Sequence, residues 1–148
     1  MPSTHLSLHY HLVFSTKNRE PWLTADIRGE VHDYLGGTIR ALNGFSHAVG
    51  GIDDHVHVFV GLRATHCLAD VMRELKSESS AWIHRKFGLR AFAWQEGYGG
   101  FTVSASSMES VRAYVLNQEV HHHGKTFQEE YVEMLTRGLV EYDERYLW

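Results

Sequence analysis

Two histidines separated by a single residue are the side chains in this sequence best placed for chemistry. His55 and His57 alternate with Val56, Val58 and Val60, the period-two pattern of a β-strand with one face in a core. Side chains two positions apart on a strand point the same way from Cα atoms about 7 Å apart, so both rings can reach one small cation. The pattern makes His55 and His57 candidate metal ligands, with two solvated histidines on an exposed sheet face as the alternative.

A second alternating segment, residues 5–14, predicts the strand that lies beside them. It places His9 and His11 on one face and the apolar set Leu6, Leu8, Tyr10, Leu12 and Phe14 on the other. Further along, Thr24 is a plausible N-cap, and apolar residues recur at helical spacing until Asn43-Gly44. This spacing predicts a helix over 24–43 whose apolar stripe packs in the core.

The remaining elements complete a recognisable order. Residues 45–51 and the strand beginning at His55 predict a hairpin, and a helical stripe from Leu68 to Phe87 is stopped by Gly88. Residues 92–95 and 101–104 flank a glycine-rich turn and predict a strand pair. The order βαββαβ predicts an α+β, ferredoxin-like or RRM-like fold with an antiparallel sheet, helices on one face and the other face open.

The last helix is expected to cover that open face. Ser106 and Glu109 have the spacing of a capping box, and Tyr114 and Gln118, four residues apart, share one side of the helix that follows. Gln118 can add a carbonyl oxygen to the two histidines and Tyr114 a phenol beside them. Oxygen ligands mixed with imidazole suit Mg²⁺ or Mn²⁺ as well as Zn²⁺.

Length and composition indicate a single soluble domain. The 148 residues are 43% hydrophobic, which suffices for one core, so we expect one domain over 1–148 with 125–148 as an acidic C-terminal tail that carries no site. Cys67 has no partner for an internal disulfide. The absence of a signal-peptide pattern and of a stretch of about 20 apolar residues predicts a cytoplasmic protein with no membrane contact.

Charge is compatible with a nucleic-acid partner without requiring one. The net charge of −4 comes entirely from the segment after Gln118, so the rest of the chain is neutral. Lys17 and Arg19 in a predicted turn, and Arg73 and Lys76 on a helix, are candidate phosphate contacts, although solvated side chains are the default interpretation. The run 121–123 of three histidines is interpreted as a polar helix end, with contact to DNA or the metal as the alternative.

Several segments in order resemble the single-tyrosine HUH transposases of the insertion-sequence-200-like (insertion sequence 200/605) family. In that family a His-hydrophobic-His strand meets a helix bearing Tyr-x-x-x-Gln. The similar segments are residues 10–19 (YHLVFSTKNR), 54–57 (DHVH), 94–101 (WQEGYGGF), 114–118 (YVLNQ), 121–122 (HH) and 141–148 (EYDERYLW). Together they span nearly the whole chain.

The resemblance implies a metal-dependent DNA transposase that cleaves and rejoins single-stranded DNA at hairpin-bearing element ends. Tyr114 would attack the DNA to give a 5′-phosphotyrosine, while His55, His57 and Gln118 hold a divalent ion, Mg²⁺ or Mn²⁺. It also implies a homodimer, associated with the nucleoid, in which the tyrosine helix is exchanged between subunits. The small polar residues 104–107 are a reasonable hinge for such an exchange.

Three alternatives stay open at this point. A domesticated relative of the same fold would bind or nick hairpins without transposing, and sequence does not separate it from an active transposase. A non-catalytic ferredoxin-like nucleic-acid binder would need aromatic residues on the sheet, where this chain has mainly histidines. A histidine-triad hydrolase would need a third histidine where this chain has Phe59.

Overall fold

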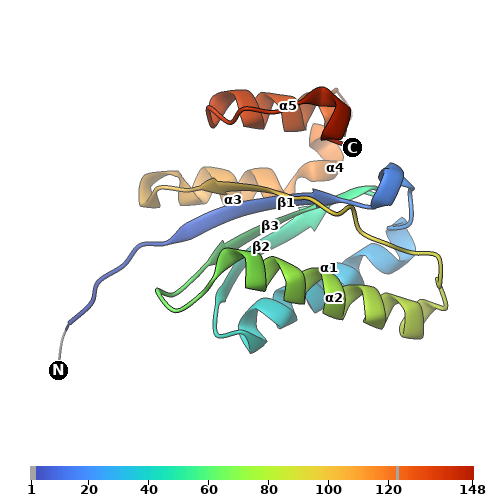
Figure 1. Cartoon of the computed structure of the whole chain (residues 1–148), viewed down its shortest axis with the longest axis horizontal. Coiled ribbons are helices and arrows are strands. Elements are labelled where there is room, and N and C mark those ends of the chain that lie inside the picture. The colour runs from blue at the N-terminus through green and yellow to red at the C-terminus, as the bar shows by residue number, and fades with distance from the viewer. Residues whose placement is uncertain (1–2, 123) are drawn as a thin grey trace.

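A four-stranded antiparallel sheet lies between two layers of helices in the computed structural model, which describes residues 3–122 and 124–148 (Figure 1). The strand order is β2-β3-β1-β4. Along the chain the elements are β1 (His9–Ser15), α1 (Ala25–Ala41), β2 (Phe45–Gly51), β3 (His55–Gly61), α2 (Leu68–Phe87), β4 (Gly99–Thr102), α3 (Met108–Leu116), α4 (Gln118–His121) and α5 (Phe127–Arg137). Short 3-10 turns occupy Lys17–Arg19, Ala105–Ser107 and Glu144–Tyr146.

This arrangement confirms the predicted α+β fold. The first six elements follow the order βαββαβ, and β1 and β3 are the central neighbours of the sheet. In their antiparallel register Val13 lies opposite His57 and Ser15 lies opposite His55. The two strands therefore place their histidines on one face and the apolar residues of the main core on the other, as their alternation predicts.

The main core lies between the sheet and the helices α1 and α2. Its sheet side is built from alternate residues of the two central strands, and its helix side from apolar stripes at helical spacing. The fully buried members are Leu12, Phe14, Val56, Val58 and Val60 from the strands and Val31, Leu35, Ile39, Leu75 and Ile83 from the helices. Each such side chain stabilises the fold by about 1.5–3 kcal/mol.

The opposite sheet face is covered by α3, α4 and α5 (Figure 1). Helix α3 lies against β2 so closely that a Cβ on Gly50 would come within 1.9 Å of the carbonyl oxygen of Val115. Helix α5 buries Phe127, Tyr131 and Leu135 against Val13 of β1. The histidine face of the sheet is therefore the floor of a second, smaller core.

The first strand begins later than its sequence pattern predicts. Residues 5–8 continue the alternation, yet β1 starts at His9, whose partner is Gly61 at the end of β3. Because β3 ends there, the preceding residues have no neighbouring strand with which to form a ladder, and the Leu6 side chain is 55% exposed. The prediction of a strand from residue 5 was wrong at this end.

The predicted strand pair around the glycine-rich turn does not form as a hairpin. Residues 99–102 form β4, which pairs with β1, whereas the segment before the turn joins the end of β1. Gln95 donates its backbone N–H to the Ser15 carbonyl at 2.9 Å, and its side-chain Oε1 accepts the Ser15 N–H at 2.6 Å. The segment before the turn therefore hydrogen-bonds to the end of β1 and not, as predicted, to residues 101–104.

The predicted capping box is also not formed. Helix α3 begins at Met108 after a 3-10 turn, and the Ser106 hydroxyl lies 3.2 Å from the Ser104 hydroxyl. Serine side chains in such a segment hydrogen-bond to one another and to nearby backbone groups, which competes with helix formation.

Within residues 3–122 and 124–148, no helix has the length and apolar character that crossing a bilayer requires.

Candidate functional site

Strand β3 directs His55 and His57 into the second core, where both side chains are completely buried. His55 Nδ1 lies 2.8 Å from Asp54 Oδ1, a carboxylate that accepts the Nδ1 proton and leaves the Nε2 lone pair free. His57 Nδ1 lies 2.7 Å from His11 Nε2. Both Nε2 atoms point toward the helices that cover the sheet, and the contacts of the two Nδ1 atoms with Asp54 and His11 fix the orientation of the rings.

Gln118 meets this pair from the first residue of α4. The helix that carries Tyr114 ends at Leu116, and a break at Asn117 separates it from α4, so the predicted single helix is two. The spacing still brings the two residues together, because Gln118 Nε2 donates to the Tyr114 carbonyl at 3.1 Å. With its NH₂ group so engaged, Gln118 Oε1 lies 3.3 Å from His55 Nε2.

Two residues of the C-terminal segment complete the cluster. His122 donates its Nδ1 proton to the Lys125 carbonyl at 2.6 Å, and its Nε2 lies 3.1 Å from His55 Nε2. Glu130 on α5 is buried and places Oε1 2.8 Å from His57 Nε2. The potential ligand atoms of His55, His57, His122 and Glu130 all lie within 4.8 Å of one another, so this group could hold a metal ion.

The orientation of three of these groups leaves lone pairs facing one another. His55 Nε2, His122 Nε2 and Gln118 Oε1 are 3.0–3.3 Å apart, while the protons of all three side chains point away to Asp54, Lys125 and Tyr114. Buried acceptors in such contact repel unless a positive charge lies among them. The cluster therefore needs a proton or a cation at its centre.

The spacing of the ligand atoms also fits an ion. Neighbouring ligand atoms, the nitrogens and oxygens that could bind a metal, lie 2.8–3.5 Å apart around the centre of the cluster. Ligand atoms bound to a metal at the usual distance of about 2.0–2.2 Å lie roughly 3–3.5 Å from one another in octahedral or tetrahedral geometry. Donor chemistry, orientation and spacing thus agree with a divalent metal site.

Protonation in the buried cluster is set by opposing effects. Burial lowers the pKa of His57 to about 4, so its ring is neutral near pH 7. Burial lowers the pKa of His122 as well, but its hydrogen bond to Glu130 and the charge of that carboxylate outweigh burial and raise it overall. Burial raises the pKa of Glu130, whereas hydrogen bonds from His122 and His57 hold it well below its usual range. Glu130 is therefore an anion, the form that binds metal.

Tyr114 projects from α3 to the edge of the same cluster. Its hydroxyl donates to Glu130 Oε2 and lies 3.2 Å from His121 Nε2. Its ring packs edge-on to the ring of His57, with centroids 5.7 Å apart. Burial, followed by the contact with Glu130, raises the pKa of the phenol well above its ordinary value, so Tyr114 is protonated in this arrangement.

The candidate phosphate contacts are not members of the cluster. Lys17 and Arg19 are in the 3-10 turn after β1, where the Arg19 guanidinium lies 5.6 Å from the Trp148 ring centroid. Arg73 pairs with Asp70 on α2 at 2.9 Å, and Lys76 donates to the carbonyls of residues 95–97. Helix α2 covers the opposite face of the sheet (Figure 1).

Sequence reasoning brought His55, His57, Gln118 and Tyr114 together but overlooked Glu130. The segment after residue 124 was interpreted as an acidic tail because its charge dominates its composition. One signal was present: Phe127, Tyr131 and Leu135 recur every four residues, the pattern of a helix with one apolar face, and Glu130 lies on that face. His122 fits the alternative that was kept open for the histidine run, and His123 lies outside the described residues.

Residues 4–118 match the family model described as transposase, IS200-like. The chain belongs to the IS200-like transposase family. The match ends at Gln118, so His122 and Glu130 lie beyond the matched segment. A comparison with curated protein sequences finds no match.

Solved structures with the same fold include two related to transposition. One is a candidate transposase from Deinococcus radiodurans R1, with 23% identity and a TM-score of 0.65 over 80% of this transposase and 95% of that chain. Another is a REP-associated tyrosine transposase bound to a REP hairpin, with 14% identity and a TM-score of 0.60 over 82% of this chain and 73% of that chain. At these identities the likeness supports the fold.

Proposed function

We propose that this transposase cleaves and rejoins single-stranded DNA at hairpin-bearing element ends, with Tyr114 as the nucleophile. The observation that carries the proposal is the contact of the Tyr114 hydroxyl with Glu130, a carboxylate that also contacts the buried His57. A nucleophile, a proton acceptor and a candidate metal cluster thus meet within one site. The hairpin bound to the REP-associated transposase supports the choice of DNA form.

The reaction exchanges one phosphoester for another. The Tyr114 oxygen forms a bond to the scissile phosphorus, the bond to the DNA 3′-oxygen breaks, and the products are a 5′-phosphotyrosine and a free 3′-hydroxyl. Glu130 Oε2, which accepts the hydrogen bond of the Tyr114 hydroxyl, is the group placed to take its proton, while solvent protonates the departing 3′-oxygen. Attack by another 3′-hydroxyl reverses these steps and rejoins DNA without ATP.

His55, His57 and Gln118 are proposed to hold a divalent ion, with His122 and Glu130 as further ligands. When bound, the ion would polarise and position the scissile phosphate and stabilise negative charge on the phosphate oxygens. Mg²⁺ and Mn²⁺ were both expected from the sequence. The imidazoles of His55, His57 and His122 favour Mn²⁺ or Zn²⁺ over Mg²⁺, which prefers oxygen ligands alone.

Substrate entry requires helix α5 to move. His55, His57, Gln118 and Glu130 are each at most 1% exposed, so a phosphate cannot reach them while α5 covers the sheet. Helix α5 is attached mainly through Phe127, Tyr131 and Leu135, a smaller set of apolar contacts than the main core. Smaller sets of contacts open at lower free energy, so α5 is the element expected to move.

A homodimer that exchanges the tyrosine helix stays a prediction of the family resemblance. The described chain places Tyr114 beside its own His57, so one subunit contains all the groups of the proposed site. Exchange would transfer the same α3 contacts to the sheet of the partner subunit.

Covalent trapping tests the proposed function. Purified protein is incubated with Mn²⁺ and single strands covering the DNA on both sides of its gene, and protein–DNA adducts are resolved on denaturing gels. We expect an adduct with the intact chain and with the control Tyr34→Phe, which removes a hydroxyl from α1 on the far side of the sheet. Tyr114→Phe should bind the same strands and give no adduct, since only the attacking oxygen is lost.

Two results would contradict the proposal. An adduct with Tyr114→Phe would assign the chemistry to another residue. Hairpin binding without an adduct from the intact protein, with Mg²⁺, Mn²⁺ or Zn²⁺, would favour a domesticated hairpin-binding protein. A perfect duplex of the same sequence serves as the substrate control and should stay uncut, because a paired strand cannot pass between the sheet and α5.

A further inference from the structure

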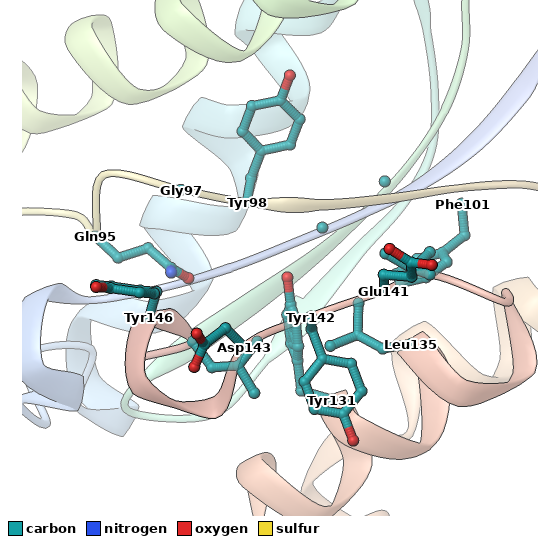
Figure 2. A pocket seen from close by; sticks show the side chains of 14 residues that line it. Gln95, Gly97, Tyr98, Phe101, Tyr131, Leu135, Glu141, Tyr142, Asp143 and Tyr146 are labelled. Atoms are coloured by element: carbon teal, nitrogen blue, oxygen red, sulfur yellow. The ribbon is translucent and has the colours of Figure 1, made fainter.

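A hollow separate from the metal cluster lies between the loop before β4 and the end of the chain (Figure 2). It has a volume of about 310 Å³, near the lower limit of small-ligand pockets. One wall is formed by Gln95 and residues 97–101, and the other by Tyr131, Leu135 and residues 140–143, 146 and 147. None of these residues has a part in the proposed cleavage reaction.

Aromatic rings dominate the side of the hollow formed by α5 and the chain end. Tyr131, Tyr142 and Tyr146 line it, together with Phe101 of β4. Tyr142 is 39% and Tyr146 79% exposed, so their faces are available to a ligand. A stacked nucleobase gains about 1–3 kcal/mol on such a ring, whichever base it is.

The Tyr131 hydroxyl is a polar group without a hydrogen bond to any described residue. Its side chain is 6% exposed and extends from α5 toward the loop before β4 (Figure 2). Only glycine at position 99 permits this, because a Cβ there would lie 2.7 Å from the hydroxyl oxygen. This oxygen is not among the buried side-chain atoms that lack a partner, so it faces the solvent of the hollow, where a bound ligand can replace water as its hydrogen-bond partner.

Gln95 and Glu141 supply a hydrogen-bond donor and an acceptor at the same hollow. The Gln95 amide oxygen is engaged by the Ser15 N–H at 2.6 Å, which orients the side chain and leaves its NH₂ group as a donor. Figure 2 shows the Gln95 amide pointing into the space and the Glu141 carboxylate at its other end. Donors and acceptors of this kind pair with the polar edges of nucleobases.

The hollow is also close to the proposed cleavage site. The ring of Phe127 stacks on His55 with centroids 4.2 Å apart and meets Tyr131 edge-on at 5.6 Å. These two ring contacts join the metal cluster to the wall of the hollow through one side of α5. A DNA strand whose phosphate occupies the cluster therefore has the hollow within reach of a neighbouring nucleotide.

We propose that this hollow binds one unpaired nucleobase of the DNA strand, next to the phosphate that is cut. The base stacks on the tyrosine rings while its edge contacts Tyr131, Gln95 and Glu141. This inference rests on the proposed function for its substrate, and it adds the residues that hold the strand in register. The acidic side chains Glu141 and Asp143 at the hollow disfavour a phosphate there, so the base is the part recognised.

Binding to short single strands tests the proposal independently of cleavage. The probes are fluorescent hexamers of dA, dC, dG and dT and a hexamer of abasic sites, which has the same phosphates without bases. For the intact chain we expect at least one base-bearing hexamer to bind about tenfold more tightly than the abasic one. The double variant Tyr131→Phe with Gln95→Glu should lose most of this preference, because it removes two polar contacts and keeps both shapes.

Both substitutions keep the contacts that hold the fold, and a control variant accompanies them. Gln95→Glu retains the oxygen that accepts the Ser15 N–H, and Tyr131→Phe retains the ring packed on Phe127. Tyr34→Phe should keep the full base preference. An unchanged preference in the double variant would overturn the proposal, as would equal binding of base-bearing and abasic hexamers by the intact chain. Adduct formation is scored separately, so an intact chain that forms the adduct without base preference retains the proposed function and loses this site.

Discussion

Glu130 is the residue that connects Tyr114, the proposed nucleophile, to the candidate metal cluster. One of its carboxylate oxygens contacts His57 Nε2 and the other accepts from the Tyr114 hydroxyl. Its anionic form is held by hydrogen bonds from histidines that outweigh the cost of burial. A single carboxylate thus joins a side chain from β3 with one from α3, although it is the last of the three in the chain.

Replacing Glu130 with Gln tests its part in metal binding. The change keeps the shape of the side chain and removes its negative charge, so we expect Mn²⁺ affinity to fall by about tenfold or more. Isothermal titration calorimetry on the purified chain measures this directly. Glu129→Gln, an exposed change on the same helix, is the control and should leave affinity unchanged. Equal affinity in the Glu130 variant would remove Glu130 from the ligand set.

The sequence predicted the histidine pair and missed the carboxylate for a physical reason. Alternation along a strand is a local property, so the shared direction of His55 and His57 follows from the six consecutive residues 55–60. The position of Glu130 depends on how α5 docks on the sheet, 73 residues after His57 in the chain. Local periodicity indicates that a helix can form there but not which surface it meets.

At the scale of elements, α3 is held at its position by the missing side chain of Gly50. The carbonyl of Val115 occupies the space that a Cβ would need, which allows the helix to approach β2 closely. Val115 directly follows Tyr114, so the depth of this contact sets the position of the tyrosine relative to the cluster. The glycine is therefore expected to position Tyr114, the proposed nucleophile.

Gly50→Ala is expected to lower adduct formation strongly while the main core stays folded. A Cβ 1.9 Å from a backbone oxygen forces α3 away from the sheet, at a cost of about 1–3 kcal/mol for overpacking. Gly29→Ala is the matched control, because nothing lies within 4 Å of its Cβ, and it should stabilise α1 by about 0.5–1 kcal/mol. Adduct yield and thermal unfolding are measured for both variants. Full activity of Gly50→Ala would show that α3 tolerates displacement.

The elements predicted well are those whose pattern and partners agree. The periodicities over 24–43 and 68–87 anticipated α1 and α2, and both helices pack on the strands whose apolar faces require cover. The errors came where backbone hydrogen bonds had more than one available partner. Residues 5–8 alternate but lie beyond the end of β3, and residues 92–95 pair with the end of β1 instead of with β4.

At the scale of the whole molecule, one chain assembles every group of the proposed site. The sheet supplies the histidines, α3 the tyrosine and the C-terminal segment the carboxylate, all within a single subunit. The family resemblance instead implies that α3 is exchanged between two subunits. The two arrangements make the same contacts and differ only in which chain owns each residue.

Mixing two inactive variants separates these arrangements. Tyr114→Phe and His55→Ala chains are unfolded and refolded together, and the adduct is measured with each variant alone as control. Because the described chain closes its own site, we expect the mixture to stay inactive, since every chain then carries one broken site. Regained adduct formation would instead establish exchange of α3, because one composite site would combine an intact tyrosine with an intact histidine pair. Size-exclusion chromatography with light scattering confirms whether mixed dimers were present.

The stacking of Phe127 on His55 has a consequence for the lifetime of a bound ion. The ring of α5 lies against the imidazole at a centroid distance of 4.2 Å, and neither histidine of β3 is accessible. An ion held there can leave only during the brief openings of α5, however weak its individual bonds are. Its residence time would then be governed by the helix, and a chelator added in excess would strip the protein at a rate independent of the chelator concentration.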